Sequence, residues 1–357
     1  MNTNKISSKF VWSVIGIMVV LIVGYFVFKG PANLATVEQV KVGAILPLSG
    51  PAAVFGEPMK NGLDMAIKDN KNIQIIYEDS KAVPADGVTA YQKLIAQGVN
   101  VVVSAYSGVS IPLAKLALEN KTPLIMSIVA ASNVTNTYAY RYYAKPSSYV
   151  IPAFTDPSSP LNKLTDIAVL HQDSEYGKSI SDIIVDVAKE KDKKIVINES
   201  FKVNETDFST VMLKIKNAKP QAVLFVPSMP AEAIAIMKKA DELKVNAIFI
   251  ETGAAFSDPA VQKQAPAMTF YTTGFKFSLP DDNSVFKDLY KSAYGANANF
   301  AAAFGYDMGK LIVACAKKSS NIQACLSQTT SVDGITGKIT GITGEEINPP
   351  MILMKVN

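Results

Sequence analysis

The sequence predicts an α/β protein of two doubly wound lobes, each a parallel sheet covered by helices. The first observation is residues 42–67, where an unbroken apolar run stops at Pro47, a loop rich in Gly, Pro and Ser follows, and helical apolar spacing begins. An apolar run without polar alternation is typical of a buried parallel strand. The second observation is that strands and helices alternate in two successive series. Ligands bind such sheets at the carboxyl ends of their strands.

The helix of this first unit is expected to open at Pro58, because proline lacks the N–H group that the first turn leaves unsatisfied. Met59, Leu63 and Ile67 then follow with the spacing of one apolar helix face. The loop before the helix would present backbone N–H groups and hydroxyls at the strand end. The alternative is an ordinary first unit of a doubly wound domain with no site.

Apolar runs predict further strands of the first series at residues 73–77, 100–104 and 123–126, with helices around 88–95 and 112–119. A second series begins near Pro146, with strands at 166–170, 194–197, 222–226 and 247–250 and helices at 177–188, 209–215 and 231–243. Helices at 285–294 and 301–316 exceed what the second lobe needs. We therefore expect the chain to return to the first lobe.

The composition excludes several classes of protein. The chain has 357 residues, of which 48% are hydrophobic and 18% charged, so two domains with real cores are expected and disorder is not. The formal net charge of +4 is interspersed in sign, and the longest basic block is residues 191–194. We expect no nucleic-acid partner.

Residues 10–28 carry no charge and are flanked by Lys5, Lys9 and Lys29. A helix of this length spans about 28 Å, close to the hydrocarbon thickness of a bilayer. The run is long for a signal peptide, and residues 33–35 match a cleavage site only weakly. We expect an uncleaved transmembrane signal anchor, with a cleaved signal peptide as the alternative. Lys5 and Lys9 favour a cytoplasmic N-terminus, which places the remaining chain at the cell surface or in the periplasm.

The chain has two cysteines, Cys315 and Cys325, and one histidine. In an oxidising compartment the cysteines predict a disulfide that closes a helix-to-helix loop, whereas two free buried thiols are the alternative. The usual zinc ligands are too few for a structural site, and we expect neither metal nor cofactor.

Motifs of common enzymes are incomplete. Gly177-Lys178-Ser179 lacks the first glycine of a phosphate loop, since Gln172 stands at that position. A Gly-x-Gly-x-x-Gly fingerprint after a strand and a Gly-x-Ser-x-Gly elbow are both missing from the sequence. We expect a protein that is not an enzyme.

Short segments in a fixed order carry a resemblance to a known family. They are Leu46-Pro47-Leu48-Ser49-Gly50-Pro51 with Phe55-Gly56 and Asn61-Gly62, residues 207–209 with 215–223, Gly305-Tyr306-Asp307, and residues 334–339. This set resembles the branched-chain-amino-acid-type (Leu/Ile/Val-binding-like) solute-binding proteins of ABC importers and covers about residues 40–355.

The resemblance implies a type I periplasmic-binding-protein clamshell, two doubly wound lobes joined by a multi-strand hinge. Chain crossings are expected near Lys145, Gly274 and Val332. The first lobe would comprise residues 40–145 and 274–332, and the second 146–273 and 333–357, after an anchor and linker at 1–39.

Tyr106-Ser107-Gly108 follows a predicted strand and precedes a predicted helix. There a hydroxyl and the N–H groups that open a helix can hold a carboxylate. Ser107 is the first candidate, and Tyr106 and Gly108 lie beside it. Ordinary loop chemistry is the alternative for each of these residues.

Residues 126–132 resemble a family segment from which backbone groups and a threonine hydroxyl reach the ligand. The resemblance makes Ser127 and Val129 candidates for ligand binding. Ala131 stands where the threonine is expected, so one contact to a carboxylate is in doubt.

In the second lobe, residues 173–177 resemble the loop whose tyrosine closes over the ligand, and Tyr176 would carry that role. Phe55 would face it from the first lobe. Residues 250–253 resemble the loop that supplies an acid to a ligand ammonium, but Gly253 occupies the position of that acid. Either Glu251 substitutes or the ligand lacks an ammonium.

The resemblance implies an extracytoplasmic solute-binding component of an ABC importer, which captures a small polar ligand by hinge closure and delivers it to an ABC permease. The expected ligand is an amino acid or a related carboxylate. A ligand-sensing receptor ectodomain that acts through a partner protein is the alternative. An exported hydrolase is a third class, which an assay for turnover would separate.

Overall fold

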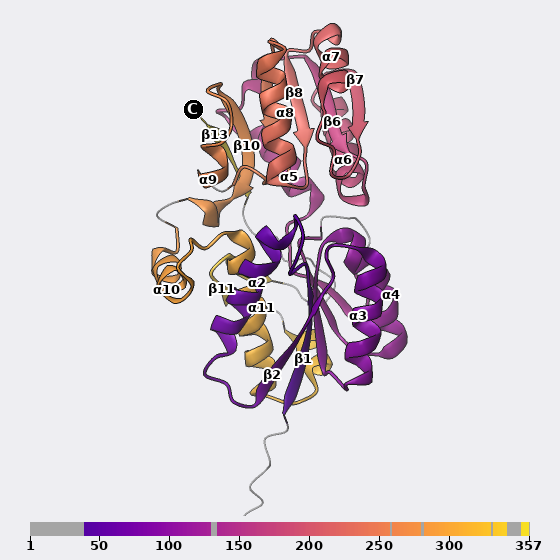
Figure 1. Ribbon diagram of the computed structural model, residues 1–357, viewed down its shortest axis with the longest axis vertical. Helices are drawn as coiled ribbons and strands as arrows, with labels where there is room; N and C mark the ends of the chain where they lie inside the picture. Colours follow the sequence, from indigo (N-terminus) through magenta and orange to yellow (C-terminus); the bar gives the residue numbers. More distant parts are fainter. Residues whose placement is uncertain are drawn as a thin grey trace, which may run out of the picture. The chain divides into compact units, whose positions relative to one another are not determined.

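The computed structural model of the chain describes residues 39–129, 134–257, 259–279, 282–329, 331–340 and 351–356 (Figure 1). Residues 40–357 form one compact unit. Of the helices that the structure describes, none has the length and apolar character needed to cross a bilayer. The anchor predicted at residues 10–28 lies outside the described residues.

The first sheet is parallel and has the order β2-β1-β3-β4-β5. Its strands are β1 (Val40–Leu46), β2 (Ile73–Asp79), β3 (Val101–Ala105), β4 (Leu124–Ser127) and β5 (Ala139–Arg141). Figure 1 shows α3 (Pro84–Ala96) and α4 (Ser107–Asn120) on one side of the sheet, with α2 (Ala53–Ile67) and α11 (Phe300–Ala316) on the other. Each side has its own apolar core, because strand residues alternate between the two faces.

The second sheet has the order β13-β10-β9-β8-β6-β7 and is parallel except for β13, which runs antiparallel to β10. Its strands are β6 (Asp166–Gln172), β7 (Lys194–Phe201), β8 (Ala222–Val226), β9 (Ile248–Glu251), β10 (Phe270–Phe275) and β13 (Met351–Val356). Helices α5 (Pro146–Thr155) and α6 (Glu175–Glu190) pack into one core, and α7 (Ser209–Ala218) and α8 (Pro230–Glu242) into the other. The predicted α/β class with parallel sheets is confirmed.

Both sheets are wound in the same order. The chain passes from β1 outward to β2 and then returns to β3 on the other side of β1, and β6, β7 and β8 repeat this path. The winding therefore reverses between β1 and β3 and between β6 and β8. Ligands of open α/β sheets bind at this point of reversal, beyond the carboxyl ends of the strands.

Helix α11 lies against α2, so the late part of the chain returns to the first sheet. The crossing is close because glycines face the partner backbone. A Cβ atom at Gly62 would stand 2.0 Å from the carbonyl oxygen of Ala302, and one at Gly305 would stand 2.1 Å from that of Met59. Any side chain at either glycine would push the helices apart.

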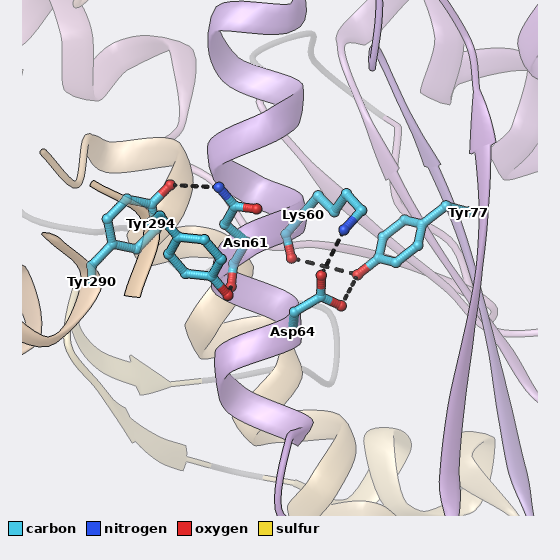
Figure 2. Close-up of polar contacts among 6 residues, drawn as sticks. All are labelled: Lys60, Asn61, Asp64, Tyr77, Tyr290 and Tyr294. Carbon is cyan, nitrogen blue, oxygen red and sulfur yellow. Dashed lines mark hydrogen bonds and ion pairs between the residues drawn. The ribbon is translucent and has the colours of Figure 1, made fainter. Parts of the chain in front are cut away.

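Tyrosines tie α2 to its neighbours on two sides (Figure 2). The hydroxyl of Tyr77 from β2 donates to Asp64 Oδ1 at 2.7 Å. On the other side, Tyr294 of α10 (Ser284–Tyr294) donates to the backbone oxygen of Asn61 at 2.9 Å, and Asn61 Nδ2 donates to Tyr290 at 3.2 Å. These bonds join α2 to the next strand and to α10, which is distant in sequence, and fix the helix that follows β1.

The prediction that Pro58 opens its helix was wrong, because α2 begins at Ala53 and Pro58 lies inside it. A proline in that position leaves the carbonyl of Val54 without its helical donor. Asn299 supplies the missing bond, since its Nδ2 donates to Val54 O at 3.1 Å. The same side chain caps α11 by accepting from Ala302 N at 3.1 Å. Pro112 also lies inside a helix, α4, which begins five residues earlier at Ser107.

Asp307 brings together two of the segments that carry the family resemblance. Its buried carboxylate accepts from Ile335 N at 2.8 Å, Thr336 N at 2.9 Å and the hydroxyl of Tyr142 at 3.0 Å. Burial raises the pKa of Asp307 above its ordinary value, against the lowering effect of these bonds. Asp307 therefore attaches the turn between β11 (Ser331–Gly334) and β12 (Gly337–Thr340) to α11.

Cys315 and Cys325 form a disulfide with an S–S distance of 2.10 Å, which joins α11 to α12 (Ile322–Gln328). The predicted bridge is therefore present. Sequence patterns did not predict several elements: β5, α5, β10, β11, β12, α12 and β13, and the short segments η1 (Pro160–Lys163), α9 (Pro259–Gln262) and η2 (Lys276–Ser278).

Candidate functional site

The connection from β3 to α4 is a single residue, Tyr106, at the reversal point of the first sheet. Its backbone has φ 73° and ψ 135°, a region that non-glycine residues seldom adopt and that costs about 1–3 kcal/mol. Tyr106 N donates to Ser127 O at 3.2 Å. This tight turn makes Ser107 the first residue of α4, where N–H groups have no intrahelical acceptor.

Ser107 and Ser127 place two hydroxyls at neighbouring strand ends. Ala105 at the end of β3 pairs with Ser127 at the end of β4, so the two serines lie on the same edge of the sheet. Ser107 is 4% exposed and Ser127 is fully buried. Within the described chain, neither hydroxyl has a hydrogen-bond partner. A buried hydroxyl left without a partner costs about 1–3 kcal/mol, and an acceptor at this edge of the sheet would remove that cost for both serines.

The loop after β4 is held by a buried cation. Ile128 has φ 53°, and Arg141 Nη1 donates to Val129 O at 3.3 Å. Burial lowers the pKa of Arg141 to about 10, so the guanidinium remains charged at neutral pH. Val129 is buried and its carbonyl already has this donor. Ala131, the other candidate in this loop, lies outside the described residues.

Phe55 and Gly108 lie beside Tyr106 and Ser107, but Phe55 is buried and Gly108 is exposed. Phe55 is 6% exposed, and its ring lies 6.2 Å from Tyr106 and 5.3 Å from Phe300, centroid to centroid. Gly108 is exposed in the first turn of α4. The expected facing of Phe55 and Tyr176 stays a prediction.

Tyr176 in the second lobe follows the end of β6 and lies in the first turn of α6. Its hydroxyl donates to Gly253 O at 3.1 Å. Desolvation of the hydroxyl raises the pKa of Tyr176 well above its ordinary value, and the charges of Glu251 and Glu232 add to the effect. The side chain is therefore a neutral phenol. Gly253 permits the contact, because a Cβ atom there would stand 2.7 Å from the hydroxyl.

Glu251 is fully buried and bonded to its own surroundings. One carboxylate oxygen accepts from Ala255 N at 3.2 Å, and the other accepts from Phe256 N at 3.4 Å and Thr272 Oγ1 at 2.5 Å. Burial raises the pKa of Glu251 to about 7, although these bonds lower it in part. The carboxyl group thus holds the loop after β9 in place.

Sequence reasoning missed Glu232, which lies at the reversal point of the second sheet and hydrogen-bonds to residues at two strand ends there. Its carboxylate accepts from Gln172 Nε2 at 2.7 Å and from Ser228 N at 3.0 Å, joining the ends of β6 and β8. The sequence contained a signal for this role, because an acid in the first turn of a helix that begins at a proline, here Pro230, commonly caps that helix. The neighbouring Met229 meets the first lobe, since Tyr106 OH lies 3.9 Å from its sulfur.

Sequence reasoning also missed two tyrosines, Tyr143 and Tyr149. Their rings lie 5.9 Å apart, and the ring of Phe275 lies 5.6 Å from Tyr143. Burial raises the pKa of Tyr149 well above its ordinary value, and Tyr143 and Tyr176 act on it in the same direction. No local pattern marked them, because they meet Phe275 only in the folded chain.

In the part of the chain that the structure describes, no group of three or more His, Cys, Asp or Glu side chains is placed to hold a metal ion. The expectation that the protein uses no cofactor stays a prediction.

Comparison with known proteins identifies relatives of this chain. The family described as periplasmic binding protein matches residues 39–357. The Leu/Ile/Val-binding protein homolog 2 of Brucella abortus (strain 2308) is 25% identical over 249 residues, which are 64% of this chain and 65% of that relative's length.

Two solved structures show the same fold. The substrate-binding protein LivJ of a branched-chain amino acid transporter from Streptococcus pneumoniae, in complex with isoleucine, has a TM-score of 0.73 at 22% identity and covers 89% of this chain and 100% of that one. The second structure is a solute-binding protein of an ABC transporter from Rhodopseudomonas palustris BisB5 in complex with 3,4-dihydroxybenzoic acid. Its TM-score is 0.75 at 22% identity, and the match covers 89% of this chain and 92% of that one.

Proposed function

We propose that this chain, which belongs to the periplasmic binding protein family and is of its branched-chain-amino-acid type, is the extracytoplasmic solute-binding component of an ABC importer. It captures a small carboxylate-bearing solute between its two lobes. Hinge closure then buries the ligand, and the loaded protein delivers it to an ABC permease.

The pair of buried hydroxyls at Ser107 and Ser127 carries this proposal. A ligand carboxylate accepts from both and satisfies two groups that otherwise stay unpaired. Each hydrogen bond to a charged acceptor contributes about 1.5–3 kcal/mol. The N–H groups and dipole at the start of α4 favour the same negative charge.

The second lobe supplies apolar and aromatic surface to the rest of the ligand. Tyr176 and Tyr149 would contact its body, and Phe55 would do so from the first lobe. The contact between Tyr106 and Met229 supports a mechanism in which both lobes surround one ligand. The bound solutes of the two neighbours, isoleucine and 3,4-dihydroxybenzoic acid, both carry a carboxyl group, which agrees with this assignment.

The proposed cellular location is inferred from the first 38 residues of the sequence. Their charge-free run at residues 10–28 supports an anchor in the cytoplasmic membrane, with the lobes at the cell surface or in the periplasm. An importer component needs that location, because its ligand arrives from outside the cell.

Native mass spectrometry of the gently purified protein tests the proposal, because a binding protein retains its ligand. We expect a bound mass that is released by denaturation and that matches a small carboxylate. Calorimetric titration of the stripped protein then gives the affinity, and recovery of the ligand unchanged separates binding from hydrolysis. Conversion of the ligand during incubation would contradict the proposal.

A further inference from the structure

We infer that the ligand is a monocarboxylate without an adjacent ammonium group, so that this site takes a simple organic acid with an apolar body rather than an α-amino acid. The inference rests on the function proposed above and names the ligand class of that same site. It follows from the hydrogen bonds that the carboxylates at the strand ends, Glu232, Glu251 and Asp79, already accept within the protein.

An ammonium group that leaves water needs an acidic partner, because a buried charge without a counter-charge is costly. Two buried acids lie beside the reversal point of the second sheet, Glu232 and Glu251. A site for an α-amino acid would direct one of these carboxylates to the ligand. Both are instead bonded within the protein.

Glu232 uses both of its oxygens. Oε1 accepts from Gln172 Nε2 at 2.7 Å and from Asn204 N at 3.2 Å. Oε2 accepts from Ser228 N at 3.0 Å and from Met229 N at 3.3 Å. Turning this carboxylate toward a ligand would break these four hydrogen bonds, three of which come from backbone N–H groups.

Glu251 is used in the same way, by two backbone N–H groups and the hydroxyl of Thr272. Its burial also raises its pKa to about 7, so the group carries only part of a negative charge at neutral pH. The acid at the end of β2, Asp79, accepts from Leu48 N at 2.9 Å and Ser49 Oγ at 2.5 Å and closes its own loop.

A neutral phenol occupies the place beside Gly253. The hydroxyl of Tyr176 donates to Gly253 O, and a Cβ atom at Gly253 would stand 2.7 Å from that hydroxyl and 2.7 Å from the backbone oxygen of Pro227, so an acidic side chain there would displace its neighbours. Burial keeps Tyr149 neutral as well. The second lobe therefore offers uncharged aromatic surface, while the first lobe offers two unpaired hydroxyls to an anion.

Calorimetric titration with matched pairs tests the inference. One pair is 3-phenylpropanoate and phenylalanine, another is 4-methylpentanoate and leucine, and benzoate is compared with the neutral benzamide. We expect each acid to bind at least about tenfold more tightly than its amino acid, and benzoate more tightly than benzamide. Equal or tighter binding of the amino acids would overturn the inference and leave the proposed function intact. Failure of every acid and every amino acid to bind would overturn both.

Glu251→Gln separates the two uses of that acid. If Glu251 serves only its loop, the variant changes the affinities for an acid and its amino acid by the same factor. A selective loss of amino-acid binding would show that Glu251 holds an ammonium and would contradict the inference. Glu232→Gln, titrated with the same pairs, applies this test to the second buried acid, and a circular dichroism spectrum checks that each variant is folded.

Discussion

Glu251→Gln should remove a pH dependence from the stability of this protein. The folded chain holds the pKa of Glu251 at about 7, against an ordinary value of 4.5. Between these two values the folded state binds more protons than the unfolded state, so the free energy of unfolding falls as the pH rises through this window. Raising the pKa from 4.5 to about 7, at about 1.36 kcal/mol for each tenfold change in proton affinity, corresponds to about 3 kcal/mol.

Urea unfolding followed by circular dichroism, from about pH 4.5 to about pH 8, measures this slope. We expect the unfolding free energy of the natural protein to fall relative to that of Glu251→Gln by about 3 kcal/mol over the range. The matched control is Asp69→Asn, which removes an exposed carboxylate and should run parallel to the natural protein. Parallel curves for the natural protein and Glu251→Gln would refute the reasoning, because Glu251 would then titrate alike in both states.

Four further predictions concern the site, the fold and the place of action. Ser107→Ala should weaken carboxylate binding by about tenfold or more in calorimetry, because one bond to a charged group is lost; an unchanged affinity would remove the hydroxyl from the site. Asn299→Ala should lower the free energy of unfolding by about 1–3 kcal/mol, because it removes a helix cap and the donor to Val54 O together; a smaller loss would show that water replaces them. Small-angle scattering should show a smaller radius of gyration with saturating ligand, and an unchanged profile would count against hinge closure. N-terminal sequencing of the mature protein should begin before residue 29, and a start after it would establish cleavage.

The sequence by itself determined the class of the fold. Apolar runs and helical spacing depend on neighbouring residues alone, so nearly every strand of the two central windings was predicted close to its place. The same local patterns located the strand ends and made Ser107 a candidate, whereas the family resemblance made Ser127 and Tyr176 candidates. The order of the matched segments identified the family.

Tertiary structure alone decided how individual residues are used. Pro58 lies inside a helix because Asn299, distant in sequence, donates to the carbonyl that the proline leaves free. Glu251 was a candidate for an ammonium site, and only the folded chain shows that its oxygens accept from Thr272 and two backbone N–H groups. Strands such as β13 were missed because their partner lies far along the chain. The physical reason is common to all three: hydrogen-bond partners are chosen by proximity in space, and local sequence does not contain that information.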